Sequence, residues 1–470
     1  MSQRRLVRQA REHLRAGRLV LAELLCLQTL ETDPEAPGAH LVLGLALQGQ
    51  GRPEEALGPL QRAAALAPDS FDAQNNLGGA LLGLRRGSEA LPHLERAIAL
   101  QPGNAVALTN LGNALLFEDG TDRAIDCYRK ALIGAPDHVP AHYNLGCALS
   151  DWGKLDEAVA CFEAARRLNP NVADIHNNLA TALQGLGRLE EATASLRAAL
   201  ALDPTCVEAH ANLHALLLDA DNLAPAIDCL RKAVTLRSTD LSIRFLLGAL
   251  LEQSGDAQAA AADLEAVAAG GGLDRARLES WRYMQGACGG RMRLIGSPVE
   301  AFRVAIAAAT TEGLVLEFGV RFGTSLRQIA ALAQQPVHGF DSFQGLPEAW
   351  HTEPRGSYST GGALPAMPDN VTLHTGWFDD TLPTFLAHHP GAVRFMNIDC
   401  DLYSSTRSVL GLLADRIVTG TVIAFDEYLL HQQWREDEFR AFQETVAGRS
   451  WRYEYLCFGL TSKQAVVRIL

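Results

Sequence analysis

The sequence of 470 residues predicts a multidomain protein: an all-α solenoid of short helical repeats, then an α/β domain with a doubly wound, Rossmann-like sheet. Two observations predict this fold class. A period of 34 residues runs through the first half, and short apolar runs alternate with helical segments after about residue 314. Gly270-Gly271-Gly272 interrupts the helical period between them. We therefore expect a solenoid at 1–272, a linker at 273–296 and the α/β domain at 297–470.

Composition and charge disfavour several classes of function, among them nucleic-acid binding and a membrane-spanning role. With 41 basic and 54 acidic side chains the net charge is −13, which disfavours nucleic acid as a partner. No apolar run approaches the roughly 20 residues of a membrane span. Nine cysteines without a C-x-x-C pair, and an N-terminus without the pattern of a signal peptide, favour a reducing cytoplasm. The arginine and alanine bias, with only four lysines, suggests a bacterial coding sequence.

The typical repeat carries glycine, alanine and proline at fixed positions. A Leu-Gly pair or a close variant begins it, alanine follows twelve residues later, and proline closes most units. The Leu-Gly register reads Leu43-Gly44, Leu77-Gly78, Leu111-Gly112, Leu145-Gly146, Leu179-Ala180, Leu213-His214 and Leu247-Gly248. This pattern resembles the tetratricopeptide repeat, a helix–turn–helix unit. We count eight repeats, in which small residues allow close helix contact and the prolines end the second helix.

One polar register suggests what the repeats bind. Asparagine recurs two residues before the glycine, alanine or histidine of five Leu-Gly-type pairs, at Asn76, Asn110, Asn144, Asn178 and Asn212. An asparagine amide donates and accepts together, which suits the backbone of an extended peptide. The register resembles the asparagine ladder of O-linked N-acetylglucosamine transferase, and this resemblance implies a groove for a protein or peptide partner. The alternative is that these residues only cap or solvate helices.

The second half alternates strands and helices. A helix starts at Ser297-Pro298 and runs to about residue 310. Strands are expected at 314–319, 336–341, 371–375, 393–399 and 420–426, with helices near 323–334, 379–388, 404–415 and 434–447. Two more strands, 451–458 and 463–469, have no helix between them and should pair antiparallel. In such sheets ligands lie beyond the carboxyl ends of the strands.

The expected strand ends carry acids and glycines. The first strand ends in Glu317-Phe-Gly319, followed by Gly323, a spacing that does not match the dinucleotide fingerprint. The second ends at Asp341, where an acid can accept two hydrogen bonds from a ribose diol. The later strands end in Asp399-Cys-Asp401 and Asp426-Glu427. Strand-end aspartates also cap helices, so a structural role is the alternative for each.

Five motifs in order resemble the class I S-adenosylmethionine-dependent methyltransferases, and among them the macrocin-type O-methyltransferases of macrolide sugars. They are Glu317 to Val320, Phe340 to Pro347, Gly376 to Pro383, Asp399 to Thr406, and Asp426 to Tyr428. The resemblance implies transfer of a sulfonium methyl group to a hydroxyl, with a sugar as the precedent. This sequence departs from the family pattern at Glu427 and Cys400.

The resemblance also implies roles for single residues. Cofactor contacts are implied for Glu317, Gly319, Gly323, Thr324, Asp341, Ser342, Phe343 and Gly376. A metal ion, Mg²⁺ by family precedent, is implied at Asp399, Asp426 and Glu427. Asp399 is a candidate catalytic residue, and either Asp401 or His431 is the candidate base.

Three functional hypotheses follow. The first is an active O-methyltransferase whose repeats recruit a protein partner, a carrier or a large acceptor. The second is a non-catalytic scaffold with a degenerate cofactor-binding domain. The third, a glycosyltransferase, is disfavoured because the strand-end motifs match methyl donors. The long, glycine-bearing segment from Glu348 to Met367 is expected to form a lid over the acceptor.

Overall fold

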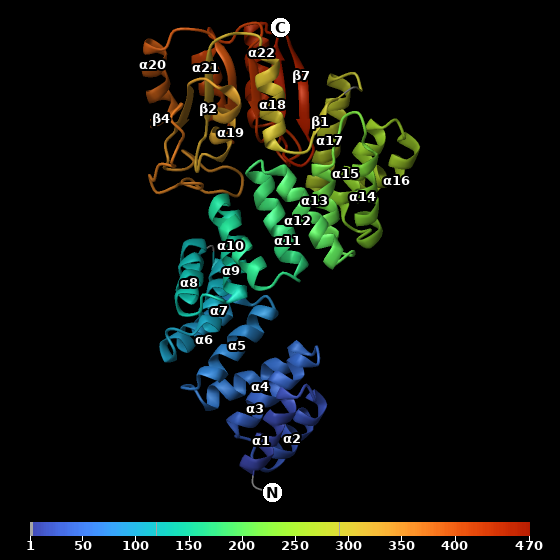
Figure 1. The fold of residues 1–470 in the computed structure, drawn as a ribbon, viewed down its shortest axis with the longest axis vertical. Coiled ribbons are helices and arrows are strands. Elements are labelled where there is room, and N and C mark those ends of the chain that lie inside the picture. The colour runs from blue at the N-terminus through green and yellow to red at the C-terminus, as the bar shows by residue number, and fades with distance from the viewer. Residues whose placement is uncertain (1–2, 119, 291) are drawn as a thin grey trace. The chain divides into compact units, whose positions relative to one another are not determined.

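The computed structural model describes residues 3–118, 120–290 and 292–470, and Figure 1 shows the course of the chain. The chain divides into two compact units, Met1–Pro170 and Asn171–Leu470. The division falls within the repeat array, so the second unit contains both the last repeats and the α/β domain. The domain boundary predicted at residue 272 stays a prediction.

The described part of the first unit is built from five helix pairs. Each pair is one predicted repeat, and consecutive helices contact one another. The helices are α1 (Gln3–Arg15), α2 (Leu19–Thr32), α3 (Pro37–Gly49), α4 (Pro53–Leu66), α5 (Phe71–Gly83), α6 (Gly87–Leu100), α7 (Ala105–Leu115), α8 (Thr121–Gly134), α9 (Val139–Asp151) and α10 (Leu155–Leu168).

The second unit continues the array with three more helix pairs and a joining helix. The pairs are α11 (Ala173–Gly185) with α12 (Leu189–Leu202), α13 (Val207–Leu216) with α14 (Ala224–Leu236), and α15 (Leu241–Gln253) with α16 (Ala257–Ala268). The joining helix α17 spans Gly272–Ala287. Along the described chain, eight helix pairs thus precede α17.

The glycine register explains why the helices of a repeat pack so closely. A Cβ atom at Gly44 or Gly78 would lie 2.5 Å from the leucine of the second helix, Leu60 or Leu94. At Gly112 it would lie 2.5 Å from the ring of Tyr128, and at Gly146 2.7 Å from Phe162. In each pair one large side chain of the second helix fills the space that a Cβ atom would need.

The α/β domain contains one eight-stranded sheet in the order β1-β7-β8-β6-β5-β2-β3-β4. Only β8 runs antiparallel to its neighbours, β6 and β7, as predicted for the last two strands. The strands are β1 (Leu294–Ile295), β2 (Leu314–Phe318), β3 (Val337–Asp341), β4 (Val371–Thr375), β5 (Val393–Ile398), β6 (Val422–Phe425), β7 (Tyr453–Gly459) and β8 (Ala465–Ile469).

Helices cover both faces of the sheet, which confirms the doubly wound class. The helices are α18 (Pro298–Ala308), α19 (Thr324–Ala333), α20 (Phe378–His388), α21 (Tyr403–Leu413) and α22 (Glu438–Arg449). Side chains alternate along β2, so that Val315 packs with α18 and α19 while Leu316 and Phe318 pack with α20 and α21. The chain crosses from one half of the sheet to the other between β2 and β5, and their adjacent ends form the switch point of the topology.

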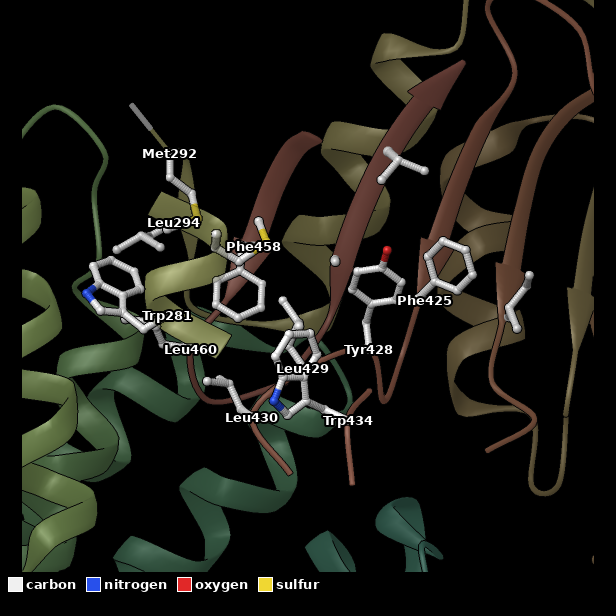
Figure 2. Close-up of a cluster of buried hydrophobic side chains, with 14 of the residues drawn as sticks. Trp281, Met292, Leu294, Phe425, Tyr428, Leu429, Leu430, Trp434, Phe458 and Leu460 are labelled. Carbon is white, nitrogen blue, oxygen red and sulfur yellow. The ribbon is translucent and has the colours of Figure 1, made fainter. Parts of the chain in front are cut away.

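The last repeats and the sheet share one hydrophobic core. Phe245 from α15 and Trp281 from α17 belong to the same buried cluster as Leu430, Trp434 and Phe458 of the α/β domain. Figure 2 shows Trp281 and the side chains from the sheet side of this core. The backbone N–H of Leu430 also donates to the hydroxyl of Ser280 at 3.1 Å. Helices α15 and α17 therefore bury apolar side chains together with the α/β domain.

Two local features differ from the sequence prediction. The strand β1 lies within the predicted linker and pairs parallel with β7 at the edge of the sheet. A two-residue strand has no periodicity of its own, so only its pairing reveals it. Helix α22 begins at Glu438 rather than near residue 434, because residues 426–437 form turns.

The glycine register gives a first prediction. Replacing Gly112 by alanine forces the Tyr128 ring to move and should lower the stability of the array by about 1–3 kcal/mol. Gly58→Ala is the matched control, because its Cβ meets nothing within 4 Å inside α4 and it should stabilise the protein by up to ~1 kcal/mol. Thermal unfolding of the full chain measures both. Equal shifts for the two variants would contradict this account of the packing.

Candidate functional site

A pocket lies at the switch point of the sheet. It has a volume of about 610 Å³, a size that suits a cofactor together with a small acceptor group. Its floor comes from the residues that follow β2, β3, β5 and β6. The strand-end residues singled out in the sequence are therefore brought to one place.

Eight of the predicted site residues line this pocket, and five do not. The lining set is Gly319, Asp341, Ser342, Gly376, Asp399, Asp401, Asp426 and Glu427. Glu317, Gly323, Thr324, Phe343 and His431 lie outside the lining. The roles assigned to both groups stay predictions.

The loop after β2 is held against the ends of both neighbouring strands. Gly319 has φ +91°, and a Cβ there would overlap the carbonyl oxygen of Asp399, so only glycine fits. The carboxylate of Asp341 accepts backbone N–H groups from Val320 at 2.8 Å and Arg321 at 2.7 Å. It also accepts the N–H of Phe343 at 2.6 Å. Asp341 thus organises the loop while its side chain lines the pocket.

Glu317 lies beneath the pocket floor in the middle of the sheet. It is fully buried, and the amide of Asn397 on β5 donates to its Oε1 at 2.8 Å. Burial raises the pKa of Glu317 to about 8, although hydrogen bonds from Ser325 and Asn397 oppose the shift. Its Oε2 is a buried oxygen without a hydrogen-bond partner. Glu317 is therefore a protonated carboxyl group at neutral pH.

Gly323 and Thr324 form the start of α19. Gly323 is the N-cap residue in the left-handed region, and Thr324 is the first helical residue. A Cβ at Gly323 would strike the methyl group of Met367 and lie 3.4 Å from Pro365. The end of the long loop after β3 therefore packs over this turn, which keeps Gly323 out of the pocket lining.

One wall of the pocket carries several carboxyl groups. Burial, followed by repulsion from Asp426 and Asp401, raises the pKa of Asp399 well above its usual value. Burial and Glu427 raise the pKa of Asp401 to about 7 and that of Asp426 to about 6. These carboxyl groups repel one another when ionised, so protonation or a bound cation would stabilise the wall.

Two neighbours from the β7–β8 turn partly balance this wall. The ammonium group of Lys463 pairs with both oxygens of Glu427 at 2.8 and 2.9 Å. The amide of Gln464 donates to Asp426 at 2.8 Å. Glu427 is thus already paired with a cation of the chain, whereas Asp399 and Asp401 face the pocket with raised pKa values.

Several lining residues were not singled out from the sequence. Arg321 extends from the glycine loop, its guanidinium lies 5.1 Å from the centre of the Tyr358 ring, and its Nε is buried without a partner. Glu348, Trp350 and Tyr358 come from the long loop after β3, and Ser404, Ser405 and Ser408 from α21. Arg321 could have been singled out from the sequence because it is a basic residue between Gly319 and Gly323.

His431 is turned away from the pocket. Its Nε2–H donates to the backbone carbonyl of Glu427 at 3.0 Å. Burial lowers its pKa to about 4, which leaves the imidazole neutral at physiological pH. Of the two candidate bases, Asp401 lines the pocket and His431 does not.

The asparagine register is half-buried and partly engaged between repeats. In the first unit, Asn110 donates to Asn75 at 3.2 Å and Asn144 donates to Asn113 at 2.8 Å, each one repeat back. In the second unit, Asn212 donates in the same way to Asn177 at 3.0 Å. Asn76 donates to the carbonyl of Asp72 in its own helix, and Asn177 donates to Asn178. The amides thus link neighbouring repeats, and their predicted contact with a peptide stays a prediction.

Comparison with known families agrees with both halves of the chain. Residues 316–428 match a family model described as a methyltransferase domain. Residues 7–71, 41–105 and 143–206 match the model of the tetratricopeptide repeat. The chain therefore combines tetratricopeptide repeats with a methyltransferase domain, and this class of domain implies S-adenosylmethionine as the methyl donor. The fold class predicted from the sequence is confirmed.

Several solved structures are similar to part of the chain. PilF of Pseudomonas aeruginosa is 20% identical over 44% of this chain and 94% of its own, with a TM-score of 0.40. MamA of Desulfovibrio magneticus RS-1 is 24% identical over 36% of this chain and 97% of its own, with a TM-score of 0.33. YrrB, described as a repeat protein with an unusual peptide-binding site, is 22% identical over 39% of this chain and 94% of its own, also at 0.33.

A comparison with curated proteins finds no match. Within residues 3–118, 120–290 and 292–470, no helix has the length and apolar character needed to cross a membrane.

The buried Glu317 gives a second prediction. Its pKa rises from 4.5 to about 8 on folding, so the folded state retains a proton that the unfolded state loses. Its contribution to the free energy of unfolding is complete below about pH 4.5 and falls as the pH rises to about 8. Glu317→Gln removes this titration but keeps an oxygen for Asn397. Denaturant unfolding at several pH values should show the variant gaining on the wild type from pH 4.5 to 8; a constant difference would contradict the assignment.

Proposed function

We propose that the chain is an S-adenosylmethionine-dependent O-methyltransferase of the macrocin type, acting on a hydroxyl group of a sugar or a related acceptor. The observation that carries the proposal is the convergence of Gly319, Asp341, Asp399 and Asp401 on one pocket at the switch point of the sheet. The match of residues 316–428 to a methyltransferase domain supports it. We also propose the cytoplasm as its location, from the cysteine pattern.

Two groups of pocket residues are proposed to hold the two parts of the cofactor, the adenosine and the methionine. Asp341 and Ser342 follow β3, where an acid can hold a ribose diol, with Phe343 packed behind them at 1% exposure. Gly319 brings its backbone to the lining of the pocket, and Arg321 lines the same pocket. A guanidinium group binds a carboxylate well, so we assign Arg321 to the carboxylate of the methionine part. Gly323 and Thr324 shape the loop, Gly376 contributes to the wall, and Glu317 supports the floor.

The charge of the pocket fits the proposed donor. S-adenosylmethionine supplies a methyl group on a positively charged sulfonium. The carboxyl groups of Asp399, Asp401 and Asp426 surround the pocket with negative charge when ionised. Such a wall attracts a cationic ligand and orients it by electrostatic interaction.

Asp401 is the proposed general base. It lines the pocket, and its pKa of about 7 lets it accept a proton from an acceptor hydroxyl near neutral pH. The oxygen of that hydroxyl forms a bond to the methyl carbon as the carbon–sulfur bond breaks, and the hydroxyl proton passes to Asp401. Asp399 lies beside it and would position the hydroxyl.

The acidic wall is also the proposed site of a divalent ion. Three carboxyl groups that could supply oxygen ligands line the pocket, Asp399, Asp426 and Glu427. Burial, followed by repulsion from Asp426, raises the pKa of Asp399. We propose that these residues hold Mg²⁺, with Lys463 leaving Glu427 when the ion binds. Such an ion would lower the pKa of an acceptor hydroxyl.

The repeats are proposed to recruit a protein partner or a large acceptor. The half-buried asparagine register supports this role in both units, because its side chains remain partly accessible. The alternative is a non-catalytic scaffold that binds the cofactor without turnover. Measurements of cofactor binding and of turnover distinguish the two functions.

Cofactor binding is the third prediction. Asp341→Ala should weaken S-adenosylmethionine binding by at least about 1.4 kcal/mol, or tenfold, in calorimetry with and without Mg²⁺. Adenosine should lose affinity in the same proportion, because the proposed contact is to the ribose. Asp369→Ala, an exposed acid outside the pocket, is the control and should bind normally. A well-folded wild type that does not bind would refute the enzyme and leave the scaffold.

The base is the subject of the fourth prediction. Asp401→Asn should retain S-adenosylmethionine binding while turnover with a sugar acceptor falls by about 10²–10⁴-fold. In the wild type, kcat/KM should rise with pH through an apparent pKa of about 7, because the ionised carboxylate is the active form. Release of S-adenosylhomocysteine measures both. A pH profile unchanged by Asp401→Asn would exclude this residue as the base.

A further inference from the structure

A second group of metal-ligating side chains lies outside the pocket. It consists of His351, His431 and Asp437, and one ligand atom from each lies within 4.8 Å of the others. None of the three residues lines the pocket. His351 belongs to the long loop after β3, whereas His431 and Asp437 belong to the turns between β6 and α22.

The histidines and the acid are already in contact. His351 Nε2 lies 2.8 Å from Oδ2 of Asp437, and the two imidazole rings are 6.0 Å apart between their centres. The side chains of His351 and Asp437 are 25% and 10% exposed, so the cluster is shielded but reachable from solvent. A small ion can therefore enter without opening the core.

The hydrogen bond of His431 leaves one ring nitrogen able to bind a metal ion. A carbonyl oxygen can only accept, so the 3.0 Å contact with Glu427 places the ring proton on Nε2. The lone pair is then on Nδ1. Histidines that bind metals usually donate the other ring N–H to a carbonyl or a carboxylate in this way.

The backbone presents His351 at the tip of a tight turn. Trp350 and Glu353 exchange both backbone hydrogen bonds, at 2.8 and 2.7 Å. His351 is the first residue inside this turn and has φ +50°. Trp350 lines the pocket, so the position of His351 determines where part of the pocket wall lies.

We propose that His351, His431 and Asp437 bind a divalent ion of the zinc class, which fastens the long loop after β3 to the segment after β6. Two imidazole nitrogens and one carboxylate oxygen form a ligand set that Zn²⁺ prefers and Mg²⁺ does not. Ligands lie about 2.0–2.2 Å from such an ion, so the three atoms must draw together around it, with water in the fourth position. Binding of the ion would replace the contact between His351 Nε2 and Asp437 Oδ2.

The bound ion would set the shape of the pocket entrance. His351 is next to Trp350, and His431 is hydrogen-bonded to the backbone of Glu427; both neighbours line the pocket. The ion therefore connects two walls of the pocket without contacting its contents. This role does not depend on whether the pocket transfers a methyl group.

Zinc titration of the metal-free full-length protein tests the proposal. We expect one Zn²⁺ per chain at this site by calorimetry, and visible absorption typical of low coordination when Co²⁺ replaces it. Binding should weaken about tenfold or more in both His351→Ala and Asp437→Asn. His388→Ala, an exposed histidine on α20, is the matched control and should bind as the wild type does. Excess Mg²⁺ should not displace the ion, which separates this site from the pocket carboxylates.

Proteolysis provides a second measurement. Arg355 is exposed in the same loop, four residues after His351, and offers a site for trypsin. Zn²⁺ should slow cleavage there in the wild type and in His388→Ala, but not in His351→Ala. No Zn²⁺ binding, or binding that survives both His351→Ala and Asp437→Asn as an adventitious ion does, would overturn the proposal.

Discussion

The close approach of β2 and β5 at their carboxyl ends is the constraint on which the site depends. The backbone of Gly319 meets the carbonyl of Asp399 with no room for a side chain between them. The N–H of Asp399 also donates to Phe318 at 2.8 Å, which extends the pairing of the two strands to their ends. Because the chain crosses the sheet at this point, the loops on either side diverge and leave a pocket.

The close approach of β2 and β5 brings several acidic side chains together where they are buried from water. Glu317 and Asn397 are directly opposite on β2 and β5, and the residues beyond them are the acids of the pocket wall. A buried carboxylate is stable only when it is protonated, hydrogen-bonded or paired. Glu317 is stabilised by protonation and Asp426 by a hydrogen bond from Gln464. Glu427 is stabilised by its ion pair with Lys463. Asp399 and Asp401 are left to interact with what enters the pocket.

The fold was largely predictable because its signals are local or periodic. Leu-Gly pairs every 34 residues specify helix pairs, since each glycine faces one leucine or aromatic residue of the next helix. Strand-end acids predicted the pocket because parallel strands end on one edge of a sheet. The edge strand β1 was not predictable, because two residues become a strand only through pairing with β7.

Other parts of the site depend on contacts between distant segments. His351 and Asp437 are 86 residues apart and belong to no common motif. Arg321 differs from other arginines only through its position at the end of β2, beside the acids of the pocket. Asp341 was expected to bind a ribose, and its three backbone partners were not foreseen, because they depend on how the loop after β2 folds back. Chemistry at strand ends is visible in the sequence, whereas the supporting contacts are not.

The shared core of the second unit bears on how the repeats serve the pocket. Helices α13 to α17 bury apolar surface together with Leu430, Trp434 and Phe458, and Gln328 of α19 donates to the carbonyl of Gly185 at 2.8 Å. Repeats packed in this way cannot swing independently of the sheet without exposing that core. A ligand bound to these repeats, as proposed, would therefore be held at a fixed position relative to the pocket. Recruitment by this part of the array would select acceptors by reach and orientation, in addition to raising their local concentration.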